Sequence, residues 1–318
     1  MAEVLILLAA YNGGRFIGEQ IESLRAQTHA DWHLLVRDDG SDDDTIAVVD
    51  RYRERDPRIE RLQDGRGRLG ASGNFSALLE AAATRGFAAV ALCDQDDVWL
   101  PERLEAGLRV LRGAGAQPLL VHSDLRLVDA TLRPIADSYM AYQGIRHRDG
   151  TPLRWLLAQN FVTGCTTLFN RALLDLALPL PREAVIHDWW LALCAASAGR
   201  IAFVDRPTVL YRQHDDNTVG ARRLMRPRRN GETAAGWRSG IENLRRSFGQ
   251  AAVLAERLER ADASPLTIEL ARCYAMLPSQ PAWRRLTTAW RAGFRRQGAR
   301  GPLFLASLLL SSFLRDGV

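Results

Sequence analysis

The feature that most constrains the fold is an alternation of short apolar runs with segments of helical period, over about the first 120 residues. The apolar runs lie at residues 4–10, 33–37 and 88–93. Between and after them, apolar side chains share one helical face in three segments: Ile17, Ile21 and Leu24; Phe75, Leu78, Leu79 and Ala82; and Leu104, Leu108 and Leu111. This alternation is typical of a parallel sheet whose strands are joined by crossover helices.

The alternation becomes irregular in the second half of the chain. Further strands are expected at residues 119–122, 125–128, 163–169 and 201–204, and a helix is expected to begin near Asp188. Beyond Gly220 the sequence is rich in arginine, and its helical period is interrupted by proline and glycine. We therefore predict an α/β fold with a mixed, mainly parallel sheet flanked by helices over residues 1–220, and a basic amphipathic helical C-terminal extension over residues 221–318.

Composition narrows the class of protein. Of the 318 residues, 47% are hydrophobic and 25% are charged, as in folded globular chains. The four cysteines lie far apart and form no CxxC pair, which argues against a disulfide framework or a zinc ribbon and favours a reducing compartment. The start of the chain does not resemble a signal peptide, and the apolar run at residues 303–314 is too short to cross a membrane.

The net charge of +5 hides an uneven distribution. There are 24 arginines against 30 acidic residues up to Gly220, but 18 against 7 from Ala221 onward. In this basic tail, Trp283, Trp290 and Phe294 lie among arginines ahead of the apolar run, a composition typical of helices at a membrane surface. We expect residues 283–314 to bind an anionic membrane surface and expect no nucleic-acid partner. The alternative is a helical subdomain whose aromatic residues pack on the core or on a partner subunit.

Three carboxylates, Asp94, Asp96 and Asp97, follow the apolar run at residues 88–93. The carboxyl end of a parallel strand is where open α/β sheets bind ligands. Because Asp94 and Asp96 flank Gln95, both can point toward one cation, and their hard oxygen ligands favour Mg²⁺ or Mn²⁺. The alternative is a solvated acidic turn that caps the following helix.

A second acidic cluster follows the second apolar run. Asp38 or Asp39 could accept hydrogen bonds from a nucleobase or a ribose, whereas the aspartates at residues 42–44 fit the start of the next helix better. The first run ends in Ala10 and Tyr11 before two glycines, so a flat ring could approach the backbone and stack on Tyr11. Helix capping and an ordinary turn are the alternatives.

Residues 65–70 spell GxGxxG, the pattern of dinucleotide-binding loops. They do not open the first strand–helix unit, and no suitable acidic residue follows about 20 residues later, so we reject that interpretation. We predict instead a loop that offers Arg66 or Arg68 to a diphosphate, with a plain surface loop as the alternative.

Two polar segments in the second half could carry chemistry. Asp188 lies among apolar and aromatic neighbours that should raise its pKa, as suits a general base that accepts a hydroxyl proton. A helix N-cap is the alternative for Asp188. His214 lies in a polar run at residues 211–217, and its neutral imidazole is a candidate third ligand for a cation held by Asp96.

Seven segments, in their order along the chain, closely resemble those of a family 2 glycosyltransferase with the GT-A fold. They are LLAAYNGGRFIGEQIESLRAQT, VRDDGSDD, GRLGASGNFSALL, CDQDDVW, NFVTGCTTLFN, HDWW and YRQHDDNTVG. The resemblance covers about residues 4–220 and is greatest to bacterial rhamnosyltransferase-like members. It implies an inverting transfer of one sugar from a nucleotide-diphosphate donor, with dTDP-rhamnose as the first choice and UDP-hexoses next.

The resemblance also implies roles on the donor side. Ala10, Tyr11 and either Asp38 or Asp39 would hold the nucleobase. Asp94 would contact the ribose or the cation. The metal would be bound by Asp96, as the last acid of the DxD motif, and by His214.

On the acceptor side, the resemblance puts Asp188 in the place of the catalytic base. The family has an acid before this residue, whereas this chain has His187, so the group that orients the base is not predicted. The acceptor-side residues that we expect are Thr163, Gly164, His187 and Trp189.

These observations predict a metal-dependent inverting hexosyltransferase that transfers a sugar to a glycan or lipid-linked acceptor in cell-surface polysaccharide synthesis. We expect it in the cytoplasm, peripheral to the inner face of the plasma membrane. One alternative is a sugar-1-phosphate nucleotidylyltransferase, which would need a charged loop after the first strand, where residues 9–14 carry no charge. Another is a non-catalytic carbohydrate- or membrane-associated module, against which the joint presence of Asp94, Asp96, Asp188 and His214 argues.

Overall fold

The computed structural model describes residues 3–309 except 114, 215–231 and 299. The described residues fall into two compact units. Unit 1 lies within Met1–Tyr139, Val162–Pro179 and Ile201–Ala221, and unit 2 lies within Met140–Phe161, Leu180–Arg200 and Arg222–Val318. The predicted division at Gly220 stays a prediction, because this residue lies outside the described ones.

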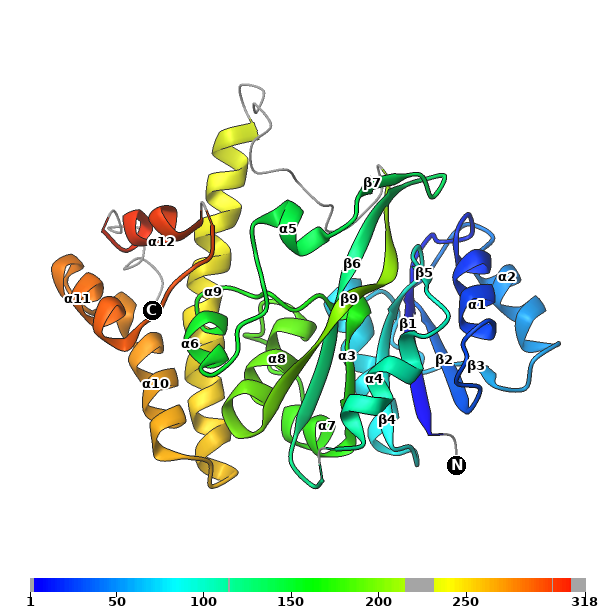
Figure 1. Cartoon of the computed structure of the whole chain (residues 1–318), viewed down its shortest axis with the longest axis horizontal. Coiled ribbons are helices and arrows are strands. Elements are labelled where there is room, and N and C mark those ends of the chain that lie inside the picture. Colours follow the sequence, from blue (N-terminus) through cyan, green and yellow to red (C-terminus); the bar gives the residue numbers. More distant parts are fainter. Residues whose placement is uncertain (1–2, 114, 215–231, 299, 310–318) are drawn as a thin grey trace. The chain divides into compact units, whose positions relative to one another are not determined.

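Unit 1 is built on a mixed sheet (Figure 1). Across the described residues, nine strands pair in the order β3-β2-β1-β4-β8-β6-β9-β5, with β7 paired to β6. The first four strands in this order are parallel, and β8 then runs antiparallel to both β4 and β6. The strands are β1 (Val4–Ala10), β2 (Trp32–Asp38), β3 (Ile59–Arg61), β4 (Ala89–Asp94), β5 (Val98–Trp99), β6 (Leu119–Asp129), β7 (Pro134–Ala136), β8 (Leu168–Asn170) and β9 (Arg200–Gln213).

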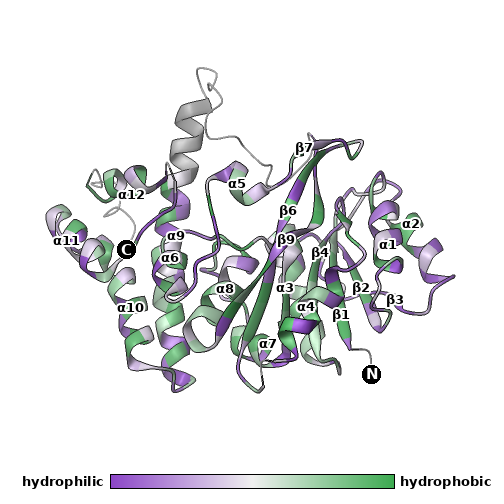
Figure 2. Ribbon diagram, in the orientation of Figure 1, coloured by the Kyte–Doolittle hydropathy of each residue, from purple (hydrophilic) through white to green (hydrophobic). Residues whose placement is uncertain are grey.

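Helices pack on this sheet through the apolar faces that the sequence predicts. Ile17, Ile21 and Leu24 of α1 are completely buried, and so are Leu78 and Leu79 of α3. Figure 2 shows the central strands near the hydrophobic end of its scale, whereas the helices also carry hydrophilic surface. The helical segments of unit 1 are α1 (Ile17–Arg25), α2 (Thr45–Arg53), α3 (Gly70–Ala83), α4 (Arg103–Leu111), the 3-10 turn η1 (Gly164–Thr166) and α7 (Arg171–Ala177).

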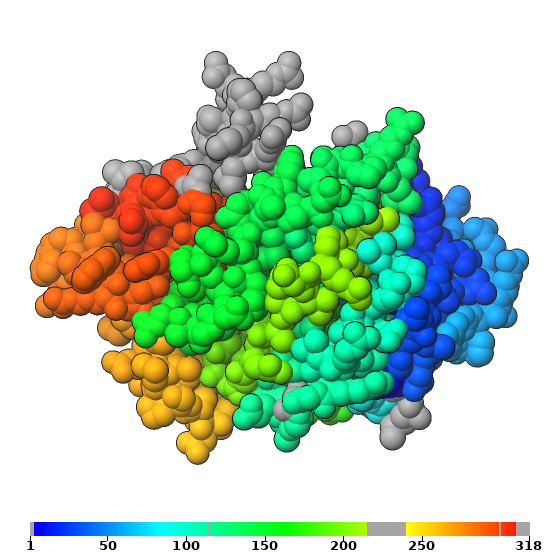
Figure 3. Space-filling model, viewed as in Figure 1, coloured from blue at the N-terminus to red at the C-terminus, as the bar shows by residue number. Residues whose placement is uncertain are grey.

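Three strand predictions differ from the structure. Residues 119–122 and 125–128 belong to one continuous strand, β6, and residues 201–204 are only the first part of β9. Much of the first half of β9 is partly exposed, and Figure 3 shows this yellow-green stretch at the surface. The strand expected at residues 163–169 is wrong except at its end, because the carbonyls of Thr163 and Gly164 accept local hydrogen bonds from Thr166 and Thr167.

Unit 2 is helical. Its α8 begins at His187, which confirms the helix expected near Asp188. Most of α8 is buried, and it packs against α6, α9 and α10. No helix among the described residues has the length and apolar composition needed to cross a bilayer. The helical segments are α5 (Tyr139–Gln143), α6 (Pro152–Leu156), α8 (His187–Ala198), α9 (Glu232–Arg260), α10 (Pro265–Ala275), η2 (Leu277–Ser279), α11 (Ala282–Ala292) and α12 (Arg300–Leu309).

Asn170 joins three parts of unit 1 and provides a test of this fold. Its Oδ1 accepts hydrogen bonds from the backbone N–H of Leu173, at the start of α7, and of Leu119, at the start of β6, each at 3.1 Å. Its Nδ2 donates to the carbonyl of Gln117 at 2.7 Å. We expect Asn170→Ala to lower the free energy of unfolding by about 1–2 kcal/mol, as measured by urea titration. Asn170→Asp keeps the acceptor and should lose less; an equal loss in both variants would contradict a capping role.

Candidate active site

Backbone register brings the carboxyl ends of three strands together in unit 1. Ala10, the last residue of β1, pairs with Asp38 at the end of β2. On the other side of β1, Ala9 pairs with Asp94 at the end of β4. Residues predicted to bind the donor therefore meet at one edge of the parallel block, which is where such sheets bind ligands.

Tyr11 and Arg68 lie against each other on this side of unit 1. The guanidinium carbon of Arg68 lies 4.1 Å from the centre of the Tyr11 ring, in a cation–π arrangement. Arg66 turns elsewhere and pairs with Glu80 at 2.6 Å. Of the two arginines predicted for the loop, Arg68 is thus the one that contacts Tyr11, a residue predicted to bind the nucleobase.

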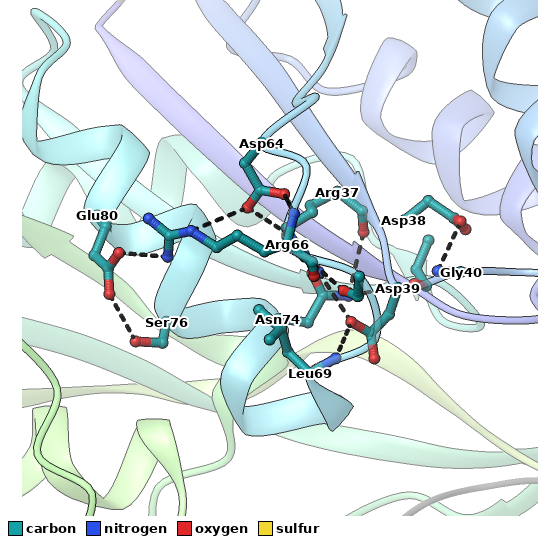
Figure 4. A network of polar contacts seen from close by, with 12 residues as sticks. Arg37, Asp38, Asp39, Gly40, Asp64, Arg66, Leu69, Asn74, Ser76 and Glu80 are labelled. Atoms are coloured by element: carbon teal, nitrogen blue, oxygen red, sulfur yellow. Dashed lines mark hydrogen bonds and ion pairs between the residues drawn. The ribbon is translucent and has the colours of Figure 1, made fainter.

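Asp39 is the centre of a buried polar network (Figure 4). Its Oδ1 accepts from the backbone N–H of Leu69 at 2.7 Å and from Arg37 at 2.9 Å, and its Oδ2 accepts from the backbone N–H of Gly70 at 2.7 Å. Gly70 is the first residue of α3, so the carboxylate lies at a helix N-terminus, where the helix dipole favours negative charge. Asp39 therefore fixes the loop before α3 to the end of β2.

Arg37 completes this network from the end of β2. It is only 2% exposed and donates to Asp64 at 2.9 Å and to Asn74 at 3.2 Å, besides its bond to Asp39. Although burial opposes its charge, hydrogen bonds to Asp64 and Asp39 raise the pKa of Arg37 above its ordinary value. The guanidinium thus stays charged inside the unit and ties the loop at residues 64–70 to the sheet.

Asp38 builds the neighbouring turn. Its Oδ2 accepts from the backbone N–H groups of Gly40 and Ser41 at 3.0 and 2.9 Å, and its Oδ1 accepts from the Ser41 hydroxyl. A carboxylate has about four acceptor positions, and Asp38 and Asp39 each already accept three hydrogen bonds from the protein. Because most of these positions are used and Asp39 is only 2% exposed, the nucleobase contact expected of Asp38 or Asp39 stays a prediction.

Asp96 and His214 form the pair that the sequence predicts for a metal. The Asp96 Oδ2 lies 2.8 Å from the His214 Nε2, although the two residues are far apart in the chain. Arg212, which sequence reasoning did not identify, supports Asp96: its Nε donates to the Asp96 carbonyl at 2.8 Å. Arg212 lies near the end of β9, two residues before His214. The remaining polar residues of the predicted run, 215–217, lie outside the described residues.

Asp94 belongs to a second group of possible metal ligands. Its carboxylate, that of Asp97 and the Cys165 thiol lie with their ligand atoms within 4.8 Å of one another. Burial, followed by the charges of Asp96 and Asp94, raises the pKa of Asp97 well above its usual value. The carboxylate oxygens of Asp94 and Asp96 are hard ligands that fit Mg²⁺ or Mn²⁺, whereas the Cys165 thiol is a soft ligand that does not.

Asp188 lies in the first turn of α8 in unit 2, where 8% of its surface is exposed. Asn160 donates from its Nδ2 to the Asp188 Oδ1 at 3.0 Å, so the carboxylate has an orienting partner that sequence reasoning did not identify. The signal for it was the position of Asn160 at the start of the segment NFVTGCTTLFN. Ile186 occupies the N-cap position, so the capping alternative for Asp188 does not describe this helix start.

The residues on either side of Asp188 are buried. Burial lowers the pKa of His187 to about 3, so this imidazole is neutral at physiological pH. The Trp189 indole N–H donates to the carbonyl of Leu156 at 2.6 Å, which joins α8 to the end of α6. Thr163 and Gly164, also predicted for the acceptor side, lie at the η1 turn of unit 1.

Sequence comparisons find glycosyltransferases that are similar to this chain. The chain is 24% identical over 218 residues to the dTDP-rhamnosyl transferase RfbG of Shigella flexneri, which covers 67% of this chain and 74% of the relative. It is 34% identical over 108 residues to the glucosyltransferase WfgD of Escherichia coli, which covers 34% and 40% of the two chains. A match to an uncharacterized glycosyltransferase of Nostoc, at 26% identity, spans 66% of that protein.

Two solved structures share the fold. A structure of Staphylococcus aureus TarS in complex with UDP-GlcNAc has a TM-score of 0.57 at 16% identity, over 98% of this chain and 91% of that chain. A mannosyltransferase from Pyrobaculum calidifontis, in complex with GDP-Man and Mn²⁺, has a TM-score of 0.52 at 18% identity, over 92% and 74% of the two chains. These likenesses confirm the GT-A type of fold predicted from the sequence.

The family model described as glycosyl transferase family 2 matches residues 5–176. This range contains the carboxyl ends of β1, β2 and β4 with the residues predicted for the donor side. Because it covers more than half of the chain, the protein belongs to glycosyl transferase family 2.

Proposed function

We propose that this glycosyltransferase is a metal-dependent, inverting enzyme whose donor is a nucleotide-diphosphate sugar and whose acceptor is a hydroxyl group of a glycan or lipid-linked glycan. The observation that carries the proposal is the contact between Asp96 and His214 at the carboxyl edge of the parallel strands. A carboxylate and an imidazole held together beside Asp94 and the Tyr11 loop are suited to bind a cation next to a nucleotide.

In this proposal Asp188 is the general base. It accepts the proton of the acceptor hydroxyl, whose oxygen attacks the anomeric carbon while the bond from that carbon to the diphosphate oxygen breaks. A single displacement from the opposite face inverts the configuration. Asn160 supports this role, because its hydrogen bond fixes one carboxylate oxygen of Asp188.

Asp96 and His214, with Asp94 nearby in sequence, would hold Mg²⁺ or Mn²⁺. Such a cation, when bound, offsets negative charge on a departing diphosphate. The chain's own contribution is to keep the ligands in place: Arg212 bonds the Asp96 carbonyl, and its Nη2 donates to Glu19 of α1 at 2.5 Å. The ligand geometry is therefore tied to a helix of the unit.

The donor that we propose first is dTDP-rhamnose, followed by UDP-hexoses. Support for rhamnose comes from the match to RfbG, the relative named as a dTDP-rhamnosyl transferase. Support for a lipid-linked acceptor comes from WfgD, which is named for a diphosphoundecaprenol acceptor. We propose a place in cell-surface polysaccharide synthesis on the same grounds.

Metal dependence can be tested with a panel of nucleotide sugars, measuring nucleotide release with and without acceptor glycans. We expect EDTA to abolish transfer and added Mn²⁺ or Mg²⁺ to restore it. Asp96→Ala should abolish transfer even when either metal is added. Asp42→Ala, which changes an exposed carboxylate of a neighbouring loop, is the matched control and should stay active. Full activity in EDTA would exclude the metal, and pyrophosphate release from NTP and a sugar phosphate would favour a nucleotidylyltransferase.

The base assignment predicts a separation between binding and transfer. Asp188→Asn should keep donor affinity, because the predicted donor residues lie in unit 1, but should lower kcat by at least about 100-fold. Asn160→Ala leaves the carboxylate in place without its hydrogen bond and should lose less activity. A collapse of donor affinity in Asp188→Asn would assign this residue to the donor site or to stability instead.

We also propose that α11 and α12 hold the enzyme on an anionic membrane surface. Trp283 and Trp290, seven residues apart on one face of α11, are 64% and 74% exposed. Leu303, Leu305 and Leu309 of α12 are about half exposed, and the helices contact each other within unit 2. Arg284 and Arg291, next to the tryptophans, are exposed and suit anionic headgroups. Phe294, predicted for the same surface, is instead buried against Tyr274, and Arg285 is also buried. Residues 310–314 of the predicted surface lie outside the described residues.

Sedimentation with liposomes tests the membrane proposal. The protein should bind anionic but not zwitterionic vesicles, and binding should weaken as salt rises. Because each arginine near the surface contributes about 1 kcal/mol, a variant with Arg284→Gln and Arg291→Gln should bind roughly 30-fold more weakly. Leu266→Ala, at an exposed apolar residue of α10, is the control and should bind normally. Equal partition to both vesicle types at any salt concentration would contradict the proposal.

A further inference from the structure

The middle residue of the Asp94-Gln95-Asp96 segment makes an unusual contact with the loop after β1. The Gln95 Oε1 accepts from the Tyr11 backbone N–H at 2.8 Å, and the Gln95 Nε2 donates to the Tyr11 carbonyl at 2.8 Å. Backbone pairing of β1 with β4 ends at Ala9 and Asp94. The carboxamide of Gln95 therefore continues this pairing beyond the end of β4 and satisfies both peptide groups of Tyr11.

This contact belongs to a set that holds the whole loop. The backbone N–H groups of residues 11–14 each donate to a side-chain oxygen at 2.8 Å, and the four acceptors are Gln95, Ser41, Thr45 and Asp43. Three of these acceptors come from the segment that follows β2. Gln95 comes from the segment that follows β4, which also carries the proposed metal ligands.

Gly13 makes room for this carboxamide. A Cβ atom built on Gly13 would lie 2.1 Å from the Gln95 Oε1 and 2.3 Å from its Cδ, far inside contact distance. The backbone of Gly13 is not in the left-handed region, so an alanine there would be excluded by Gln95 and not by backbone strain. Tyr11, Gly13 and Gln95 thus fit together as one packed arrangement.

We propose that Gln95 is a positioning residue for the nucleotide: it fixes the peptide group of Tyr11, the residue whose ring is expected to stack on the base, to the segment that carries Asp94 and Asp96. The inference rests on the proposed function and deepens it. The loop after β1 and the segment after β4 are then held in a fixed relative position. Nucleotide affinity should therefore depend on Gln95 even when no cation is present.

Calorimetric titration of dTDP and UDP in EDTA tests this dependence. We expect Gln95→Ala to weaken binding of the preferred nucleotide by at least about tenfold. Gln95→Glu should bind the nucleotide no better than Gln95→Ala does. It keeps an acceptor for the Tyr11 N–H but places a second oxygen against the Tyr11 carbonyl. With saturating Mn²⁺, KM for the donor should rise more than kcat falls.

Gln27 provides a matched control for a purely structural loss. Its carboxamide makes the same kind of paired contact in unit 1, accepting from the Leu104 N–H at 3.0 Å and donating to the Leu100 carbonyl at 2.9 Å. Gln27→Ala should lower thermal stability while leaving the nucleotide Kd unchanged. If Gln27→Ala weakened nucleotide binding as much as Gln95→Ala does, the loss of affinity in both variants would come from lower stability, and the inference would be wrong.

The glycine supplies a second, independent test. Gly13→Ala alone should weaken nucleotide binding, because the methyl group of the alanine displaces the Gln95 side chain. The double variant with Gln95→Ala should be no worse than Gln95→Ala alone, whereas independent roles would give additive losses. If the wild type binds nucleotide and Gln95→Ala binds it equally well, the inference is overturned. If the wild type binds no nucleoside diphosphate either in EDTA or with saturating Mn²⁺, the proposed function itself fails.

Discussion

The predicted donor side of unit 1 depends on the parallel pairing of β1 with β2 and with β4. Every residue of β1 from Val4 to Ala9 has a fixed partner on both sides, so a slip of one residue would turn its side chains to the opposite face. The loops at residues 11–14, 38–44 and 94–97 all begin where these strands end. The backbone hydrogen bonds of the sheet therefore determine which polar side chains lie close together at its edge. Contacts between those side chains only add to this placement.

The regular part of the fold could be predicted because periodicity reports burial directly. The apolar runs and helical faces of the first 120 residues or so form buried strands and helices, and the carboxylates after them lie at the expected sheet edge. The same reasoning wrongly predicted a strand at residues 163–169. Local hydrogen bonds there form a 3-10 turn, although the composition is typical of a strand. Periodicity carries no information about such bonds.

The least predictable parts of the site are contacts between distant segments. Asn160 reaches Asp188, and Arg212 supports Asp96, through packing that no spacing rule encodes. Asp97 lies in the same motif as Asp96, yet it is completely buried while Asp96 is not. Burying crowded carboxylates opposes folding, so their presence at the end of β4 favours a role in binding or catalysis.

Arg37 has a consequence for engineering donor preference in this protein. The loop at residues 64–70 carries Arg68, which contacts Tyr11, so it is a natural target for exchange between relatives. Its carbonyls at residues 66 and 67, Asp64 and the first turn of α3 are all anchored to the Arg37–Asp39 pair. A loop taken from a relative would have to pack against Arg37 and Asp39, two buried charged residues whose partners lie in the present loop. Residues 64–70, Arg37 and Asp39 should therefore be exchanged together.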